Sequence, residues 1–264
     1  MAGVRPPWRH AVVTGASSGI GEAIARELAM LGVGLTLVAR RSEELERLAT
    51  QLRRKGAPEV EVLVADLTER RGLAAVEARL ADGSRPVDLL VNDAGMGTGG
   101  PFAELSIDHE VAEIELNVVA VVRLTHAAVG PMRERGRGAV LNVSSLAGLA
   151  PAPNNATYAA SKAFVTSFSE SLHEDLRNTG VSVTAVLPGF TRTEFHQHVG
   201  RDTVRRVPRQ VWMSATTVAQ SAVTATAAGR AICIPGWGYR LLAGATSLLP
   251  RGTRRRIVGW MGRG

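Results

Sequence analysis

A glycine-rich turn near the amino terminus constrains the fold of this chain more than any other feature. The segment VVTGASSGIGEAIA (12–25) joins a β-branched run at 10–15 to an apolar, helix-periodic segment at 19–32. Glycine in such a turn lets backbone amides approach a pyrophosphate, which the amino terminus of the following helix attracts. The pattern predicts a dinucleotide-binding strand–helix unit. The alternative is a tight turn that binds no ligand.

The same alternation of strand and helix patterns continues to about residue 189. Short apolar runs rich in β-branched residues predict strands, and longer amphipathic patterns predict helices. Ser42 is expected to cap the second helix, and Gly32 and Gly56 to end the first and second helices. The expected strands are 10–15, 34–40, 60–67, 87–95, 138–145, 181–189 and 231–236, and the expected helices are 19–32, 42–56, 69–82, 108–134, 156–179 and 215–228.

Apolar strands separated by helices are typical of a parallel sheet that is covered on both faces. We therefore expect an α/β fold with a doubly wound, Rossmann-type parallel sheet. The 264 residues are 45% apolar and 21% charged, and no repeat or linker divides them, which suits one domain. The expected organisation is a single NAD(P)-binding domain over 1–264, with a cofactor and catalytic core at about 8–195, a substrate loop at 190–213 and a basic tail at 236–264.

Cysteine content and hydropathy bear on the compartment. Cys233 is the only cysteine, which excludes an internal disulfide and fits a reducing environment. The segment before the first strand lacks the long apolar run of a secretory signal, and no uncharged apolar stretch reaches the length of a membrane span. We therefore expect a cytoplasmic protein. The segment HQH (196–198) could bind a metal, but no carboxylate cluster accompanies it, so no metal is expected.

Positive charge is concentrated towards the carboxyl terminus. Residues 203–264 contain ten arginines and neither a lysine nor an acidic residue, and the whole chain has a net charge of +7. In the basic tail, arginines alternate with tryptophan, tyrosine and leucine, as in amphipathic helices that lie at a membrane surface. The tail could instead contact an acidic partner, cover the substrate site, pack on a subunit or form a solvated face. Nucleic acid is not expected, because no recognition-helix or aromatic stacking pattern is present.

Five residues of the glycine-rich turn are candidates for phosphate binding: Gly15, Ser17, Ser18, Gly19 and Gly21. The glycines give access to the backbone, and the serines add hydroxyl donors. The spacing is G-x-x-x-G-x-G rather than the G-x-G-x-x-G of many dinucleotide folds.

The end of the second strand bears on which dinucleotide binds. An acidic residue there binds the ribose 2′-hydroxyl of NAD, whereas an arginine accommodates the 2′-phosphate of NADP. This chain has Arg40 and Arg41 at the position, and a guanidinium holds phosphate in a bidentate arrangement. We therefore favour NADP(H), although one or both arginines could simply be solvated.

Tyr158 and Lys162 are four residues apart in an expected helix and would share one face. A nearby ammonium favours phenolate and should lower the tyrosine pKa from about 10, as acid–base catalysis at neutral pH requires. Alone, the spacing is often a surface coincidence. Ser144 or Ser145, at the carboxyl edge of the sheet, could hydrogen-bond a developing alkoxide. Asn117, in an otherwise apolar helix, is either a packing amide or the mark of a helix distortion whose carbonyl holds a water.

Taken together, these motifs resemble the short-chain dehydrogenase/reductase family, in its shorter single-domain branch. The resemblance covers about residues 8–195, and the motifs occur in the family's order. They are TGASSGIG (14–21), Asp66, NDAG (92–95), Asn117, SS (144–145), YAASK (158–162) and PGFTRT (188–193).

The resemblance implies a role for each matching residue. Tyr158 would be the general acid or base, Lys162 would lower its pKa and bind the nicotinamide ribose, Ser145 would be the catalytic serine, and Asn117 would support a proton relay. Ser17 and Ile20 would touch the cofactor phosphates, Asp66 the adenine, Asn92 the adenosine ribose and Thr193 the carboxamide. The further cofactor contacts implied by the motifs are Leu67, Ala94, Gly95, Pro188, Gly189 and Thr191.

One position departs from the family. The family usually has NNAG, and this chain has Asp93 in place of the second asparagine. That asparagine is understood to brace the central sheet, so the aspartate is expected to lose two donors and to bring a charge to a buried place.

The expected activity is NADP(H)-dependent interconversion of an apolar ketone or aldehyde and its alcohol, by a likewise expected homodimer or homotetramer. An apolar substrate is favoured because most residues expected beyond the sheet edge are apolar. The alternatives are a non-catalytic dinucleotide sensor or scaffold on the same fold, and a nucleic-acid-binding module. The residues expected to line the substrate site are Met96, Phe102, Leu146, Leu149, Pro151, Asn155, Phe190, Phe195 and Trp212.

Overall fold

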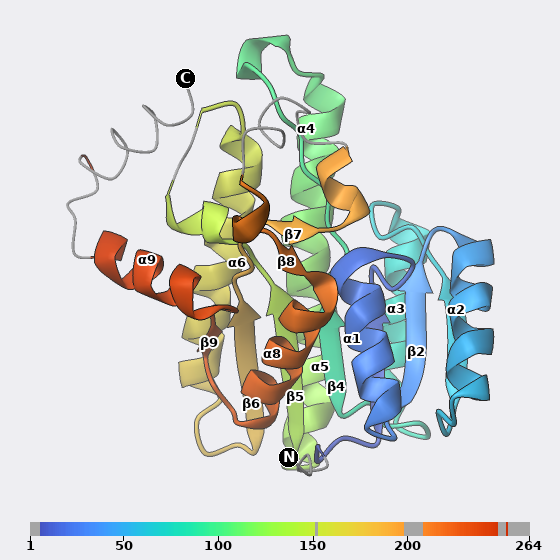
Figure 1. Cartoon of the computed structure of the whole chain (residues 1–264). Helices are drawn as coiled ribbons and strands as arrows, with labels where there is room; N and C mark the ends of the chain where they lie inside the picture. Colours follow the sequence, from blue (N-terminus) through green and yellow to red (C-terminus); the bar gives the residue numbers. More distant parts are fainter. Residues whose placement is uncertain (1–5, 151–152, 198–207, 248–251, 253–264) are drawn as a thin grey trace.

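A computed structural model describes residues 6–150, 153–197, 208–247 and 252 of the chain. Its centre is a seven-stranded sheet in the order β3-β2-β1-β4-β5-β6-β9, in which every neighbouring pair is parallel (Figure 1). The order reverses between β1 and β4, which is where ligands bind in open α/β sheets. The strands are β1 (His10–Thr14), β2 (Gly34–Ala39), β3 (Val60–Val64), β4 (Leu89–Asn92), β5 (Gly138–Val143), β6 (Val181–Val186) and β9 (Ile232–Cys233).

Helices cover both faces of this sheet, as predicted (Figure 1). Buried residues of α1, α2 and α8 join one hydrophobic cluster, and those of α3 and α5 join the other, with the carboxyl end of α6 packed against it. The doubly wound α/β prediction is confirmed. The helices on the two faces are α1 (Gly19–Met30), α2 (Ser42–Arg54), α3 (Arg70–Ala81), α5 (Ala120–Glu134), α6 (Ala156–Asp175) and α8 (Ala215–Ala227).

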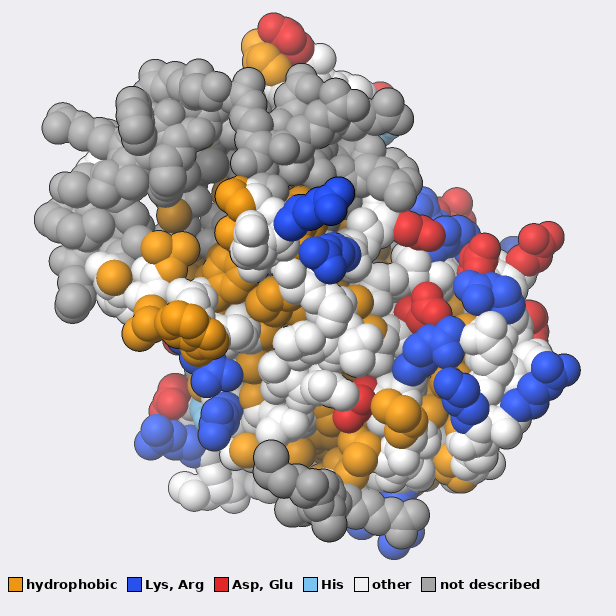
Figure 2. Space-filling model, in the orientation of Figure 1, with side chains coloured by type: hydrophobic (Ala, Val, Ile, Leu, Met, Phe, Trp, Pro, Cys, Tyr) orange, Lys and Arg blue, Asp and Glu red, His pale blue; other side chains and the backbone are white. Residues whose placement is uncertain are grey.

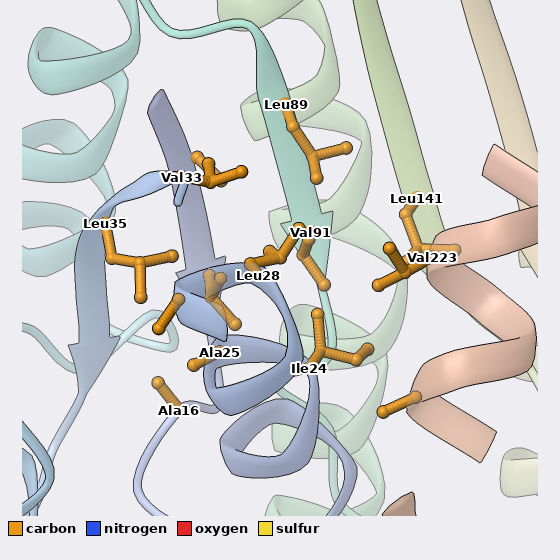
Figure 3. Packing of buried hydrophobic residues seen from close by; sticks show 14 of the residues in the cluster. Ala16, Ile24, Ala25, Leu28, Val33, Leu35, Leu89, Val91, Leu141 and Val223 are labelled. Carbon is orange, nitrogen blue, oxygen red and sulfur yellow. The ribbon is translucent and has the colours of Figure 1, made fainter. Parts of the chain in front are cut away.

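Alternation along each strand explains why two layers form. In β1, Ala11 and Val13 face one cluster and Val12 faces the other, because successive side chains of a strand point to opposite faces. Figure 3 shows Ile24 and Leu28 of α1 packed near Val91 of β4 in the first cluster. Each such side chain contributes roughly 1.5–3 kcal/mol when it is buried.

The helix ends largely follow the sequence. Gly32 and Gly56 have φ of +78° and +89°, the left-handed conformation that glycine adopts freely, and they end α1 and α2 as expected. The capping prediction for Ser42 is wrong. Ser42 is the first residue of α2, and Arg41 stands at the N-cap with no side-chain capping bond.

The helix expected at 108–134 is divided into three parts. It consists of α4 (Ile107–Ile114), a π-helical turn (Glu115–Val119) and α5. A π-helical turn inserts one extra residue and is frequent at functional sites. The distortion expected at Asn117 is therefore present, because Asn117 is the middle residue of that turn.

The segment expected to be a substrate loop has regular structure at both ends. Strands β7 (Thr191–Arg192) and β8 (Met213–Ser214) pair in parallel and lie beyond the carboxyl ends of the main sheet (Figure 1). Residues 198–207, within this segment, lie outside the described part of the chain.

The basic tail begins with α9 (Trp237–Ser247). Trp237, Leu241 and Leu242 are strongly exposed on it, and Figure 2 shows apolar side chains where Figure 1 places α9. The remainder of the tail, 248–264, lies outside the described residues except for Gly252. In the described part of the chain, no helix combines the length and hydropathy that crossing a membrane requires.

Candidate active site

The glycine-rich turn leads from β1 into α1, directly against the end of β4. A Cβ on Gly15 would lie 2.8 Å from Ala94 N, and one on Gly21 would lie 2.6 Å from Asp93 Oδ2, so neither position accepts a side chain. Gly19 has φ of +63° at the start of α1. Packing therefore requires glycine at 15 and 21, and the backbone conformation requires it at 19 and also at 15, where φ is +68°.

The amino terminus of α1 fits an anionic ligand. The N-cap residue, Ser18, makes no side-chain capping bond. The first backbone amides of the helix therefore have no hydrogen-bond acceptor from the Ser18 side chain. Ser17, Ser18, Gly19 and Ile20 are all partly exposed around this end. A phosphate group would complete these donors, and the helix dipole would favour it.

The two arginines at the end of β2 have different partners. Arg41 donates to the backbone carbonyl and the hydroxyl of Ser17 and forms an ion pair of 3.1 Å with Glu194. Arg40 is more exposed and lies 3.5 Å from the carboxylate of Asp66. The Arg41 guanidinium therefore lies beside the glycine-rich turn and the Arg40 guanidinium beside the end of β3, the region where an adenosine phosphate is expected.

Asp66 follows β3 and has partners of its own. Burial would raise its pKa, but hydrogen bonds from the hydroxyl and amide of Thr68 and the charge of Arg40 outweigh this effect and lower it. The side chain of Leu67 is buried in a hydrophobic cluster, so only its backbone can contact a ligand. The expected roles of the two residues therefore involve different groups, a carboxylate at 66 and the main chain at 67.

Asn92 does not present its side chain to the cofactor region. Its amide donates to Thr125 Oγ1 (3.1 Å) and to Asn142 Oδ1 (2.8 Å), and Asn142 in turn donates to Ser169 Oγ (2.9 Å). Asn92 and Asn142 are register partners on β4 and β5. This buried network links β4, β5 and their neighbouring helices through Asn92, the residue before the position at which the family's asparagine is understood to brace the sheet. Any contact of Asn92 with a ribose would have to come from its backbone.

Asp93 instead faces the glycine-rich turn and Lys162. Burial raises its pKa to about 7, although the charge of Lys162 and a hydrogen bond from the Gly21 amide act in the opposite direction. The backbone amides of Asp93 and Ala94 both donate to Thr14 Oγ1 at 3.1 Å. Sequence analysis did not identify Thr14, although its position before Gly15 in the glycine-rich motif could have indicated this link.

The two candidate serines point in different directions. Ser144 is buried and bonds to Lys162 O and Thr166 Oγ1, both at 2.7 Å, so it packs β5 against α6. Ser145 is partly exposed and lies close enough to Tyr158 to act on its pKa through a side-chain interaction that lowers it. Of the two serines left open by the strand pattern, the structure brings Ser145 to the tyrosine.

Tyr158 and Lys162 share one face of α6, with the ammonium 5.8 Å from the centre of the phenol ring. Burial raises the pKa of Tyr158 to about 12, the Ser145 side chain opposes this, and the charges of Glu113 and Asp93 add to it. The net lowering expected from the nearby ammonium is therefore not found, because burial dominates the pKa of Tyr158. Burial also lowers the pKa of Lys162 to about 8, and its ammonium donates to Val143 O at 2.9 Å.

Asn117 holds the chain next to this pair. Its side chain accepts from Met96 N (3.0 Å) and donates to Met96 O (2.8 Å) and Ser161 Oγ (3.1 Å). A Cβ at Gly95 would lie 3.1 Å from Asn117 Oδ1 and 3.4 Å from Lys162 Nζ. The asparagine is thus a packing amide, and it also lies in a distorted helix, whereas its expected part in a water-linked proton relay stays a prediction.

The segment after β6 reaches back over the glycine-rich turn. Thr193 is the nearest side chain to Gly19, Glu194 pairs with Arg41, and the ring of Phe195 lies 5.5 Å from that of Tyr158. Thr191 is buried and donates to Gly189 O at 3.0 Å. This segment therefore links the cofactor region with the tyrosine.

Tyr239 of α9 contributes to the same region and was not identified from the sequence. Its hydroxyl accepts from Phe190 N (3.1 Å) and donates to Val211 O (2.9 Å), and its ring fills the space beside Gly189. One side chain therefore joins both ends of the substrate loop. Pro188 precedes this contact and accepts a backbone bond from Leu146.

Several residues expected to line the substrate site gather here. The rings of Phe190 and Trp212 pack in a tilted arrangement 5.5 Å apart across the two ends of the loop, whereas Phe102 is strongly exposed on its own 3-10 turn (Phe102–Glu104). Pro151 and His198 lie outside the described residues. Among the residues that are described, no group of three or more histidines, cysteines and acidic residues is arranged to hold a metal.

Comparison with known proteins agrees with this geometry. A family model described as short chain dehydrogenase matches residues 9–203. The sulfoacetaldehyde reductase 2 of Chromohalobacter salexigens is 38% identical over 70% of this chain and 73% of its own length. The very-long-chain 3-oxoacyl-CoA reductase of Anas platyrhynchos is 36% identical over 70% of this chain, and the match spans only 60% of that longer reductase.

A solved structure covers more of the chain. The short-chain dehydrogenase from Sphingobium yanoikuyae in complex with NADPH superposes with a TM-score of 0.81 at 35% identity, over 90% of this chain and 93% of its own. The chain therefore belongs to the short-chain dehydrogenase/reductase family, whose members are NAD(P)-dependent oxidoreductases of carbonyl and alcohol groups.

Proposed function

We propose that this protein reduces an apolar ketone or aldehyde with NADPH, with Tyr158 as the proton donor. The observation that carries the proposal is that Ser145 and Lys162 both lie beside the Tyr158 side chain, Ser145 close enough to act on its pKa and the Lys162 ammonium 5.8 Å from the ring centre. A dinucleotide sensor or scaffold would not need this arrangement, which favours catalysis over that alternative.

The chemistry follows from these groups. Bound NADPH supplies the hydride that adds to the carbonyl carbon. Tyr158 gives its phenolic proton to the carbonyl oxygen, so the carbonyl becomes an alcohol and the tyrosine a phenolate. Ser145 stabilises the developing negative charge on the same oxygen, and the Lys162 ammonium stabilises the phenolate. A tyrosine pKa of about 12 keeps the donor protonated at neutral pH, which suits reduction.

The preference for NADP(H) rests on Arg40 and Arg41. Both follow β2, with Arg41 beside Ser17 of the glycine-rich turn and Arg40 beside Asp66 after β3. The NADPH complex of the Sphingobium yanoikuyae relative supports the same preference.

The preference for an apolar substrate rests on the aromatic residues near Tyr158. Phe195 packs on Tyr158, and Phe190 and Trp212 pack on each other across the two ends of the substrate loop. The relatives do not decide the matter, because their names include both a very-long-chain acyl-CoA and the small charged sulfoacetaldehyde.

Partners beyond the substrate are also proposals. Ile107, Val111 and Ile114 are exposed on α4, which supports self-association into a dimer or tetramer. Trp237 and Leu241 on α9, followed by the arginine-rich tail, support contact with an anionic membrane surface. Salt-sensitive binding to anionic vesicles, lost on truncation at Pro235, would support the membrane contact, and equal behaviour of the two chains would refute it.

The test of the proposed reaction is NADPH oxidation with a panel of bulky apolar ketones and with sulfoacetaldehyde as the charged comparison. Tyr158→Phe should lower kcat by about 10²- to 10⁴-fold. Tyr239→Phe is a matched control, because it also removes a phenolic hydroxyl but not the expected proton donor. Turnover that survives Tyr158→Phe would overturn the mechanism, and a preference for sulfoacetaldehyde would overturn the substrate class.

A further inference from the structure

Two buried carboxyl groups lie beside the proposed active site and have no part in the mechanism above. Glu110 and Glu113 are three residues apart on α4, with relative exposures of 3% and 0%. Residues at this spacing share a helix face. Two ionised carboxylates buried together repel each other and lose their hydration, so their protonation state needs an explanation.

A single hydroxyl joins the two acids. Thr98 Oγ1 lies 2.8 Å from Glu113 Oε2 and within hydrogen-bonding distance of Glu110 Oε1. A threonine hydroxyl has one proton, so it can donate to only one carboxylate. The other carboxyl group must either face the hydroxyl lone pairs without a proton between them or carry the proton itself. One proton on the pair therefore satisfies both contacts.

The remaining contacts indicate which acid carries that proton. Glu110 Oε2 accepts from the hydroxyl of Thr157, so both oxygens of Glu110 have hydroxyl donors. Glu113 Oε2 accepts from the Thr98 amide at 2.8 Å, but Oε1 is buried and has no hydrogen-bond partner in the described part of the chain. Burial also raises the pKa of Glu113, with the charge of Glu110 adding to the effect and Thr98 and Lys162 opposing it. Glu113 is therefore the better site for the proton.

We propose that Glu113 is a neutral carboxylic acid at neutral pH and donates to Thr98, which donates to Glu110. This chain continues to Thr157, the residue before Tyr158, and so holds the start of α6 against α4. Glu113 is thereby a positioning residue. Because it is neutral, it also places no negative charge near Tyr158. When ionised, Glu113 and Asp93 both raise the pKa of Tyr158, and both raise the pKa of Lys162 as well.

The shared proton can be counted without measuring activity. A native state that retains a proton which the unfolded chain releases loses stability as pH rises, and its unfolding constant grows about tenfold per pH unit for each such proton. Asp93 would contribute to the same slope, so the comparison is made in an Asp93→Asn background. Above pH ~5, a glutamate of the unfolded chain is ionised. In this range the stability of Asp93→Asn should fall more steeply with pH than that of the double variant Asp93→Asn/Glu113→Gln, and the difference in slope should correspond to about one proton. Equal slopes would overturn the proposal.

Infrared spectroscopy provides a second test that does not depend on the stability of the Glu113→Gln variant. At pH 7, the Asp93→Asn protein should show a carboxylic acid C=O band that shifts in D2O. Absence of this band would overturn the proposal. Glu170→Gln, an exposed position on α6, is the matched control and should leave the band unchanged.

The effect on catalysis rests on the proposed function of Tyr158. When Glu113 loses its proton at alkaline pH, its charge is one of the causes of the raised Tyr158 pKa and should hinder formation of the phenolate needed for alcohol oxidation. Glu113→Gln should therefore move the rising limb of the oxidation pH profile to lower pH, and an unmoved limb would overturn the electrostatic role. A retained proton in a protein that shows no turnover would instead support the shared proton and overturn the proposed function.

Discussion

Replacement of Asp93 by asparagine removes a buried charge with little change in shape. The asparagine Oδ1 can still accept from the Gly21 amide, so the link to the glycine-rich turn is preserved. The family usually has asparagine at this position, so the substitution also tests why the aspartate is tolerated.

The magnitude follows from the Asp93 pKa. Burial raises it from 3.8 to about 7, which is about three pH units at roughly 1.4 kcal/mol each, or about 4 kcal/mol at most. Part of the residue reaches solvent, so about half of that is a better expectation. Because the folded pKa is the higher one, stability is greatest below pH ~4 and is lost as pH rises towards about 7.

Urea unfolding of the wild type and Asp93→Asn at pH 5 and pH 8 measures this effect. The stability of the variant relative to the wild type should rise by about 1–3 kcal/mol between the two pH values, because only the wild type must ionise a buried acid. Asp108→Asn, an exposed change on α4, is the control and should show no such rise. A relative stability that is flat or falls with pH would show that Asp93 is not buried as an acid.

Two further variants test the cofactor and the loop. Replacing both Arg40 and Arg41 by alanine should raise the KM for NADPH about tenfold or more and should raise the KM for NADH less. The reason is that charge-assisted bonds to a phosphate contribute roughly 1.5–3 kcal/mol. Arg47→Ala is the control, and equal effects on both cofactors would contradict the 2′-phosphate role. Tyr239→Phe should raise the ketone KM several-fold with a smaller change in kcat, because it leaves the Phe190 amide without its acceptor. An unchanged ketone KM in steady-state assays would show that other contacts hold the loop.

The sheet and its helices could be predicted because their causes are local. Alternating apolar residues, β-branched runs and helix-ending glycines such as Gly32 act within a few residues of the chain. The short strands were overestimated at their ends, as for β4, where the expected 87–95 shortens to Leu89–Asn92. The motif residues from the glycine-rich turn to the tyrosine and lysine were found for the same reason, since each has a fixed local spacing.

The contacts that sequence analysis missed are long-range. The brace of Asn92 depends on Asn142, fifty residues away, and the direction of its side chain is set by the pleat of β4. The bond from Tyr239 to Phe190 spans forty-nine residues from a tail that showed only an amphipathic pattern. The pKa of Tyr158 was expected in the wrong direction, because the burial that raises it cannot be read from a four-residue spacing.

The opposed pKa values of Tyr158 and Lys162 predict the pH dependence of reduction. With a pKa of about 12, Tyr158 stays protonated and can act as the proton donor. Of this pair, the first group to lose its proton as pH rises is therefore Lys162, at about pH 8. Its neutral form no longer stabilises the phenolate, so kcat/KM for ketone reduction at saturating NADPH should fall as pH passes about 8. The charge of Asp93 raises the Lys162 pKa.

Asp93→Asn should therefore move this falling limb to lower pH, although the same substitution stabilises the fold at alkaline pH. Asp108→Asn should leave the limb in place. A limb that stays fixed or moves to higher pH in Asp93→Asn would show that Lys162 does not set it. The opposite signs explain how an aspartate can persist at this position: the charge that destabilises the folded chain also keeps Lys162 protonated.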